Sequence, residues 1–133
     1  MNKIYTLGLV MFSFCVNNNL MAACGGTLTP NLGVVSGKLV QGSYNGESWN
    51  EVHCSNNKLW DLKQGNSDPV DPSEYVGEWR IDGNQLEHKY DTLVYRYDLY
   101  GLGGVNYCLQ APGGNPSINV TITTVQNPSD VCK

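Results

Sequence analysis

The sequence predicts an all-β fold, a single small antiparallel barrel or sandwich of about eight strands stapled by two disulfides. Short segments of the chain alternate apolar and polar residues, as half-buried strands do. Turn signals rich in Gly, Pro and Asn separate these segments at intervals of about eight to twelve residues. No stretch after the N-terminal segment shows the periodicity of an amphipathic helix.

The strands follow in order from this alternation. In the clearest case Leu86, His88 and Tyr90 share one face while polar residues occupy the other. Short connections such as Asp82-Gly83-Asn84 suit hairpins. We expect strands at about 34–41, 48–55, 59–63, 79–81, 85–90, 93–99, 105–109 and 118–124.

One segment interrupts this pattern between the third and fourth expected strands. Residues 64–75 contain Gly65, Pro69 and Pro72, which do not fit a central strand. We expect a long surface loop here, with one helical turn at 72–74. Loops of this length in compact domains are often functional.

The N-terminal segment resembles a secretory signal peptide. A single cation, Lys3, precedes an apolar run over 4–16, and Ala22 and Ala23 end the segment. We expect residues 1–23 to be removed, leaving one domain at 24–133 that is secreted to the cell exterior or the periplasm and is not inserted into a membrane. Its seven cations and twelve acids give a net charge of about −5, which disfavours nucleic acid as a partner.

The cysteines of the expected mature chain are Cys24, Cys54, Cys108 and Cys132. An even number in a small exported domain predicts two disulfides. Of three possible pairings we favour Cys24–Cys54 with Cys108–Cys132, because each then joins neighbouring parts of the chain. The alternative that Cys24 is lipidated stays open, although it would leave three cysteines to pair.

A series of short motifs is spaced along the chain: Trp49 with Glu51-Val52-His53-Cys54, 59–65, 68–72, 76–79, His88-Lys89-Tyr90, Tyr95 and Tyr107-Cys108. This series resembles an uncharacterised group of small exported bacterial proteins that has no established activity. Gly77-Glu78-Trp79 also resembles the Gly-x-Trp motif of lipocalin-like barrels, where it lies near the first strand; here it falls in the middle of the domain. That resemblance implies a barrel and transfers no ligand.

The candidate binding residues lie in two neighbouring stretches. One is a strand face, which we expect to be solvated, with Trp49 the ring most expected at the surface; the other is the long loop and its flanks. Three carboxylates in the loop suggest calcium, but the segment lacks the glycine and spacing of an EF-hand, so a rigid turn is the preferred interpretation. The candidates are Trp49, Glu51, His53, Trp60, Asp68, Asp71, Glu74 and Tyr75.

The two histidines are the natural places to look for catalysis or metal binding. His88 lies on the predicted inner face, where we expect a core histidine bonded to a tyrosine hydroxyl or the backbone. Neither His53 nor His88 falls in a recognised metal spacing, and we expect neither metal nor cofactor. The preferred function is therefore non-catalytic binding of a protein partner or small ligand, as in an effector, inhibitor or carrier; the alternative is a small secreted hydrolase using His53 or His88 with a nearby carboxylate.

Overall fold

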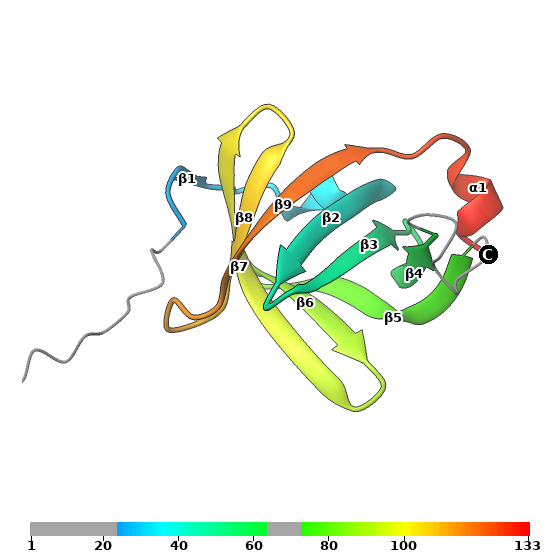
Figure 1. Ribbon diagram of the computed structural model, residues 1–133, viewed down its shortest axis with the longest axis horizontal. Coiled ribbons are helices and arrows are strands. Elements are labelled where there is room, and N and C mark those ends of the chain that lie inside the picture. Colours follow the sequence, from blue (N-terminus) through cyan, green and yellow to red (C-terminus); the bar gives the residue numbers. More distant parts are fainter. Residues whose placement is uncertain (1–23, 64–72) are drawn as a thin grey trace, which may run out of the picture.

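The computed structural model describes residues 24–63 and 73–133. They form one closed barrel of eight antiparallel strands with one extra short strand (Figure 1). The predicted all-β class is confirmed, and of the two architectures considered the barrel is the one observed. The predicted signal peptide at 1–23 lies outside the described residues.

The barrel is an up-and-down meander. Each strand from β2 to β8 pairs with the next along the chain, β9 pairs back onto β2, and β1 adds to the second half of β7. The elements are β1 (Thr27–Leu28), the 3₁₀ helix η1 (Leu32–Val35), β2 (Lys38–Tyr44), β3 (Glu47–His53), β4 (Lys58–Leu62), β5 (Ser73–Asp82), β6 (Gln85–Tyr90), β7 (Leu93–Gly103), β8 (Asn106–Gln110), β9 (Ser117–Thr124) and α1 (Pro128–Val131).

Two expected boundaries were wrong in the first half of the chain. Residues Leu32–Val35 form a 3₁₀ helix where a strand was expected to begin, and β2 continues to Tyr44 through the expected turn. The chain reverses only at Asn45 and Gly46, which both have positive φ (52° and 77°), as a two-residue hairpin turn requires. The β2–β3 hairpin is therefore longer than the expected strand ends at 41 and 48 indicated.

The expected loop at 64–75 also ends earlier than predicted. Ser73 already belongs to β5, so the expected helical turn at 72–74 is wrong for its last two residues. Trp60 of β4 pairs with Tyr75 of β5, and the register of the two strands shifts between Leu59 and Trp60, as in a β-bulge. Pairing with β4 therefore extends the fifth strand into a stretch whose prolines suggested a loop.

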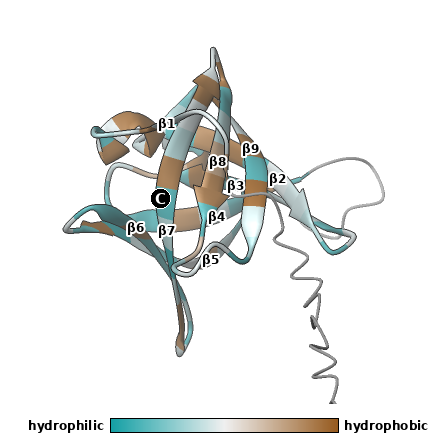
Figure 2. Cartoon of the chain, turned by 90° about the vertical axis from the view of Figure 1, so that its left-hand side faces the viewer, coloured by the Kyte–Doolittle hydropathy of each residue, from teal (hydrophilic) through white to brown (hydrophobic). Residues whose placement is uncertain are grey.

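Apolar side chains form a core inside the barrel. Alternating hydrophobic and hydrophilic bands mark the strands in Figure 2. The helix η1 leads into the first residues of β2, and its Leu32 and Val35 are buried in this core. Helix η1 thus fills the end of the barrel at which β2 begins. The buried core residues are Leu32, Val35, Val40, Leu59, Trp79, Leu86, Leu99, Leu109, Ile118, Val120 and Ile122.

A second, smaller core lies outside the barrel wall. Here Val52 of β3 and Cys54, which directly follows β3, pack against Val125 and Val131 from the C-terminal segment that contains α1. In Figure 1 this segment lies beside β3 and β4. Consequently the second half of β3 is buried on both faces, which removes the polar outer face expected of a half-solvated strand.

The two predicted disulfides are present, but the favoured pairing was wrong. The bonds join Cys24 to Cys108 and Cys54 to Cys132, with sequence separations of 84 and 78 residues. The first holds the N-terminal strand region against β8, and the second fastens the C-terminus to the end of β3. Proximity along the chain misled the prediction because the closed barrel brings Cys24 next to β8 and the segment after β9 next to the end of β3.

Candidate functional site: a cavity at the open end of the barrel

The end of the barrel opposite η1 contains a cavity of about 850 Å³. The turns β2–β3, β6–β7 and β8–β9 surround it and lie along the lower side of Figure 1. Cavities of roughly 300–1,000 Å³ are the size that holds small organic ligands. Its lining residues are Tyr44, Asn45, Glu47, Trp49, Glu51, His88, Tyr90, Leu93, Val94, Tyr95, Arg96, Tyr97, Leu109, Ala111, Pro112, Pro116 and Ile118.

A carboxyl group bonded to a tyrosine crosses the floor of this cavity. Glu51 projects inward from β3 and Tyr90 from β6, and the Tyr90 hydroxyl donates to the carboxyl oxygens of Glu51 over 2.7 and 3.0 Å. Only 7% of Glu51 is exposed. The strand pattern places it there, because Glu51 is two residues from Trp49 and therefore shares its face.

A pair of histidines lies one step deeper. His53 is two residues beyond Glu51, and His88 is two residues before Tyr90, so the two strands bring the rings together. Their Nε2 atoms lie 2.8 Å apart, and both side chains are buried. One ring must donate and the other accept, which requires that at least one histidine be neutral. Two hydrogen-bonded pairs, His53–His88 and Glu51–Tyr90, therefore connect β3 with β6 across the interior; we call these pairs the polar cross-links.

Burial sets the protonation of these groups. Desolvation raises the pKa of Glu51 to about 7, against a smaller lowering by the Tyr90 hydrogen bond, and the nearby acid Asp61 adds to the increase. Desolvation lowers the pKa of His88 to about 4, and it holds the pKa of His53 well below its usual value with a further contribution from His88. Near neutral pH the histidines are uncharged, while Glu51 is poised between its two forms.

Aromatic rings form the walls above this floor. Adding a Cβ at Gly42 would bring it within 3.0 Å of Trp49 Cζ2, so the bare glycine makes room for the indole of Trp49. The rings of Tyr90 and Tyr95 meet edge to face with centroids 6.0 Å apart. Higher up, Leu93 on the β6–β7 turn is 57% exposed and lines the rim. The cavity thus has aromatic walls above a polar floor.

The structure separates the residues predicted to bind. Trp49, Glu51 and His53 point into the barrel, so the prediction that this face is solvated was wrong. The reason is the outer core: the C-terminal segment covers Val52 and Cys54, and the charged face is then the one enclosed by the barrel. Trp49 is partly buried against the core and is not a surface ring.

The remaining predicted residues lie elsewhere. Trp60 packs against the outer core and meets Tyr75 edge to face at 5.9 Å, while Glu74 is exposed and pairs with Asp61 in the β4–β5 ladder. Among the described residues, the predicted site is therefore divided between the inside and the outside of the barrel wall. Asp68 and Asp71 lie outside the described residues.

The prediction missed the residues that complete the site. His88 was correctly expected on the inner face, but its partner is His53 and not a tyrosine or the backbone. Tyr90 and Tyr97 were not among the predicted binding residues, although both line the cavity. The available signal was the repeated pattern of two polar groups two residues apart, Glu51 with His53 and His88 with Tyr90, on faces otherwise apolar.

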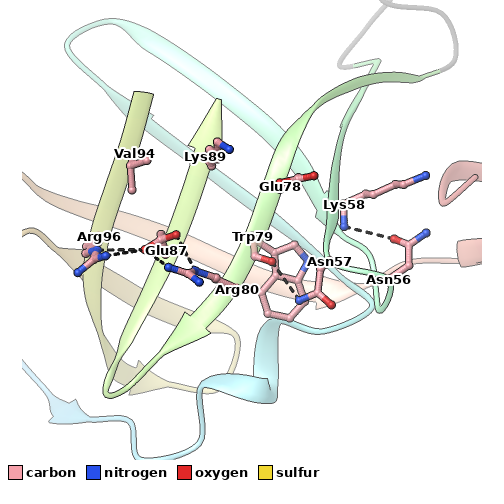
Figure 3. Close-up of a pocket in the computed structure, with 10 residues that line it drawn as sticks. All are labelled: Asn56, Asn57, Lys58, Glu78, Trp79, Arg80, Glu87, Lys89, Val94 and Arg96. Atoms are coloured by element: carbon pink, nitrogen blue, oxygen red, sulfur yellow. Dashed lines mark hydrogen bonds and ion pairs between the residues drawn. The ribbon is translucent and has the colours of Figure 1, made fainter. Parts of the chain in front are cut away.

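A second hollow of about 660 Å³ lies outside β5, β6 and β7 (Figure 3). Its centre is Glu87, which accepts from Arg80 Nε at 2.7 Å and pairs with Arg96 Nη2 at 2.9 Å; Asp82 also pairs with Arg96, at 3.1 Å. The hydrogen bond from Arg80 is the main cause of a lowered pKa at Glu87. Because these charges already pair with one another across three strands, we interpret this hollow as a stabilising surface network.

Within 24–63 and 73–133, no three His, Cys, Asp or Glu side chains gather in a way that could hold a metal ion. The same part of the chain has no helix long and apolar enough to cross a membrane.

No protein-family model, curated protein or solved structure matches the chain. Its function is therefore argued from the geometry of the cavity.

Proposed function

We propose that the chain is an exported, non-catalytic binding protein that holds a small organic molecule in the open end of its barrel. The observation that carries this proposal is the aromatic-walled cavity of about 850 Å³ with two polar cross-links beneath it. Apolar walls with a few well-placed polar groups are typical of small-molecule sites. The signal-like N-terminus and the two disulfides support export, because disulfides persist in oxidising compartments.

The hydrolase alternative has less support from the same cavity. General base catalysis by histidine needs a ring oriented by a carboxylate and accessible to substrate. Here His88 bonds to His53, and the carboxyl of Glu51 bonds to Tyr90. With its pKa lowered to about 4, His88 is also a weak base near neutral pH. The polar groups therefore suit recognition better than proton transfer.

The proposal is tested by titrating the chain, purified with both disulfides formed, with the neutral fluorophore N-phenyl-1-naphthylamine. We expect saturable binding with one probe per chain and a rise in probe fluorescence. Replacing Ala111, which lines the cavity, with Trp should block the opening without removing a core side chain. The control is Leu102→Ala, at an exposed site on the β7–β8 hairpin away from the cavity. Unsaturable binding, or equal binding to the Ala111→Trp variant, would contradict the proposal.

A further inference from the structure

We propose that the barrel cavity selects organic cations, amines carried on an aromatic or other apolar body, and that the carboxylate of Glu51 is their counter-ion. This inference rests on the proposed function and specifies its ligand class. It depends on three features of the cavity: the bonding of Glu51, the charges around it, and the rings above it.

The carboxyl of Glu51 has acceptor capacity that its known partner does not fill. An ionised carboxylate offers about four lone-pair sites. Tyr90 supplies a single hydroxyl hydrogen to the two oxygens, which lie 2.7 and 3.0 Å from its Oη. The pKa of Tyr90 is raised by burial and by Glu51, so this hydroxyl remains protonated. An ammonium group brings up to three more N–H donors to the same oxygens, in hydrogen bonds that charge strengthens.

The charges around the floor favour a cation over an anion. The charged side chain that acts most on Glu51 is another acid, Asp61 on β4. The two histidines below are uncharged near neutral pH, because burial lowers the pKa of each. An anionic ligand would therefore meet the ionised carboxylate of Glu51 in a poorly solvated site with no charged histidine beneath it, whereas a cation would be attracted to that carboxylate.

A cation at the cavity rim has already been neutralised by other residues. Arg96 lines the opening, but its guanidinium pairs with Glu87 and Asp82 on the outer face of the sheet. It therefore contributes little attraction for an anionic headgroup inside. The charge at the rim therefore does not reverse the preference of the cavity floor for cations over anions.

Aromatic rings surround the approach to Glu51. Tyr90 and Tyr95 stand edge to face, Tyr97 packs near His88 with ring centroids 5.7 Å apart, and Trp49 lines the opposite wall. The faces of Trp and Tyr rings attract ammonium groups, more strongly where water is displaced. The same rings cover the apolar body of an amine. The carboxylate of Glu51 thus suits the ammonium group of such a ligand, and the surrounding rings suit its apolar body.

The match also predicts a pH dependence. Because the pKa of Glu51 is about 7, the fraction ionised rises about tenfold between pH 6 and pH 8, and amine affinity should rise with it. Burial lowers the pKa of His53 and His88 and raises the pKa of Tyr90 and Tyr97, so these four groups stay uncharged across the range. The other titratable groups near this part of the cavity are Asp61 on β4, Tyr95 on β7, and Glu47 and Arg96 at the rim.

The test uses three ligands of matched shape: 2-(1-naphthyl)ethylamine, 2-(1-naphthyl)ethanol and 3-(1-naphthyl)propanoate. Their affinities are measured at pH 8 and pH 6 by calorimetry and by displacement of N-phenyl-1-naphthylamine. We expect the amine to bind at least tenfold more tightly than the alcohol, the carboxylate to bind most weakly, and only the amine to bind more tightly at pH 8. Glu51→Gln keeps the size of the side chain and should weaken amine binding at least tenfold more than it weakens binding of the alcohol or the probe.

The outcomes separate this inference from the proposed function. If the probe and alcohol bind but the amine shows no advantage, or if Glu51→Gln leaves amine binding unchanged, the ligand class is wrong and the binding function stands. If neither the probe nor any of the three ligands binds, both proposals fail. Probe binding to Glu51→Gln serves as the control that the variant keeps its cavity.

Discussion

Inside the barrel, His53 on β3 and His88 on β6 share a hydrogen bond between Nε2 atoms 2.8 Å apart. Strands β4 and β5 separate their parent strands in the sheet, so the bond spans the interior and does not follow a wall. Each ring satisfies a polar atom of the other in a volume that water does not enter freely. The stability of the barrel should therefore depend on the pair and not on either ring alone.

We expect single and double replacements of this pair to be non-additive. His88→Leu leaves the buried Nε2 of His53 without its partner, which should lower the free energy of unfolding by about 1–3 kcal/mol. The double variant His53→Leu/His88→Leu removes both polar groups and should cost less than the sum of the single changes. Urea denaturation of the wild type, both single variants and the double variant at pH 7.5 completes the cycle; additive costs would show that the two rings act independently.

The pH dependence of stability should consist of two opposing contributions. The pKa of Glu51 is raised to about 7 by folding, so its contribution is fully present below pH 4.5 and is lost as the pH rises through 7. The pKa of His88 is lowered to about 4, so its contribution is present above pH 6.5 and is lost as the pH falls toward 4. Each corresponds to about 3 kcal/mol, and in the wild type they partly cancel.

Two variants separate these contributions. Glu51→Gln should retain the loss of stability in acid and should become more stable than the wild type by about 2–3 kcal/mol at pH 8. The double leucine variant should instead lose stability as the pH rises from 4.5 to 7. Thermal or urea unfolding measured at half-unit pH steps checks both trends; parallel curves for the wild type and Glu51→Gln would refute the assignment of the raised pKa to this carboxyl.

The Cys54–Cys132 disulfide should be important for stability. It closes a 78-residue separation and fastens the C-terminal segment over the outer core. Replacing both cysteines with Ala should lower the free energy of unfolding by about 4 kcal/mol in the loop-entropy model. The matched control is Cys24→Ala/Cys108→Ala, which opens a similar separation of 84 residues but should leave the outer core in place.

Proteolytic peptide mapping without reduction checks the pairing itself. We expect linked peptides containing Cys24 with Cys108 and Cys54 with Cys132. Recovery of a Cys24–Cys54 peptide from native protein would contradict the structure.

Gly77 should resist substitution because of a close approach between strands. A Cβ added there would collide with the backbone carbonyl oxygen of Lys89 on β6. Gly77→Ala should therefore destabilise the fold by about 2 kcal/mol or more. Gly101→Ala on β7 is the matched control, because its nearest new contact, Thr29 Oγ1, lies at 3.7 Å. A thermal unfolding midpoint that falls equally in the two variants would argue against the collision.

The alternation of apolar and polar residues was enough to predict the class of fold and the inner face of β6, including His88. It failed in the second half of β3, where both faces are buried and no polar face remains to mark the outside. The face that carries Glu51 and His53 was expected to be solvated. Only the C-terminal segment packed over the outer face reverses this assignment, and local sequence patterns do not report such long-range contacts.

The disulfide pairing and the cavity could not be predicted for the same reason, because both depend on contacts between residues that are far apart in the sequence. Closing the barrel brings Cys24 to Cys108 and Cys54 to Cys132, which no spacing along the chain distinguishes from the other pairings. In the same way, Glu51 and Tyr90 meet across the interior although 39 positions separate them. Trp49 and Glu51 were predicted as binding residues from their residue types. Tyr90 and Tyr97, which line the same cavity, were not among the predicted binding residues.

The overlap of the two disulfides has a consequence for a chain cut by a protease. Cys54 lies between the ends of the first bond, and Cys108 lies between the ends of the second. A single cut anywhere from 24 to 132 therefore leaves two fragments that are still covalently joined by at least one bond. With the pairing of sequence neighbours, a cut between Cys54 and Cys108 would have released the halves. The interlaced bonds keep a nicked molecule together, so its strands can stay paired around an occupied cavity.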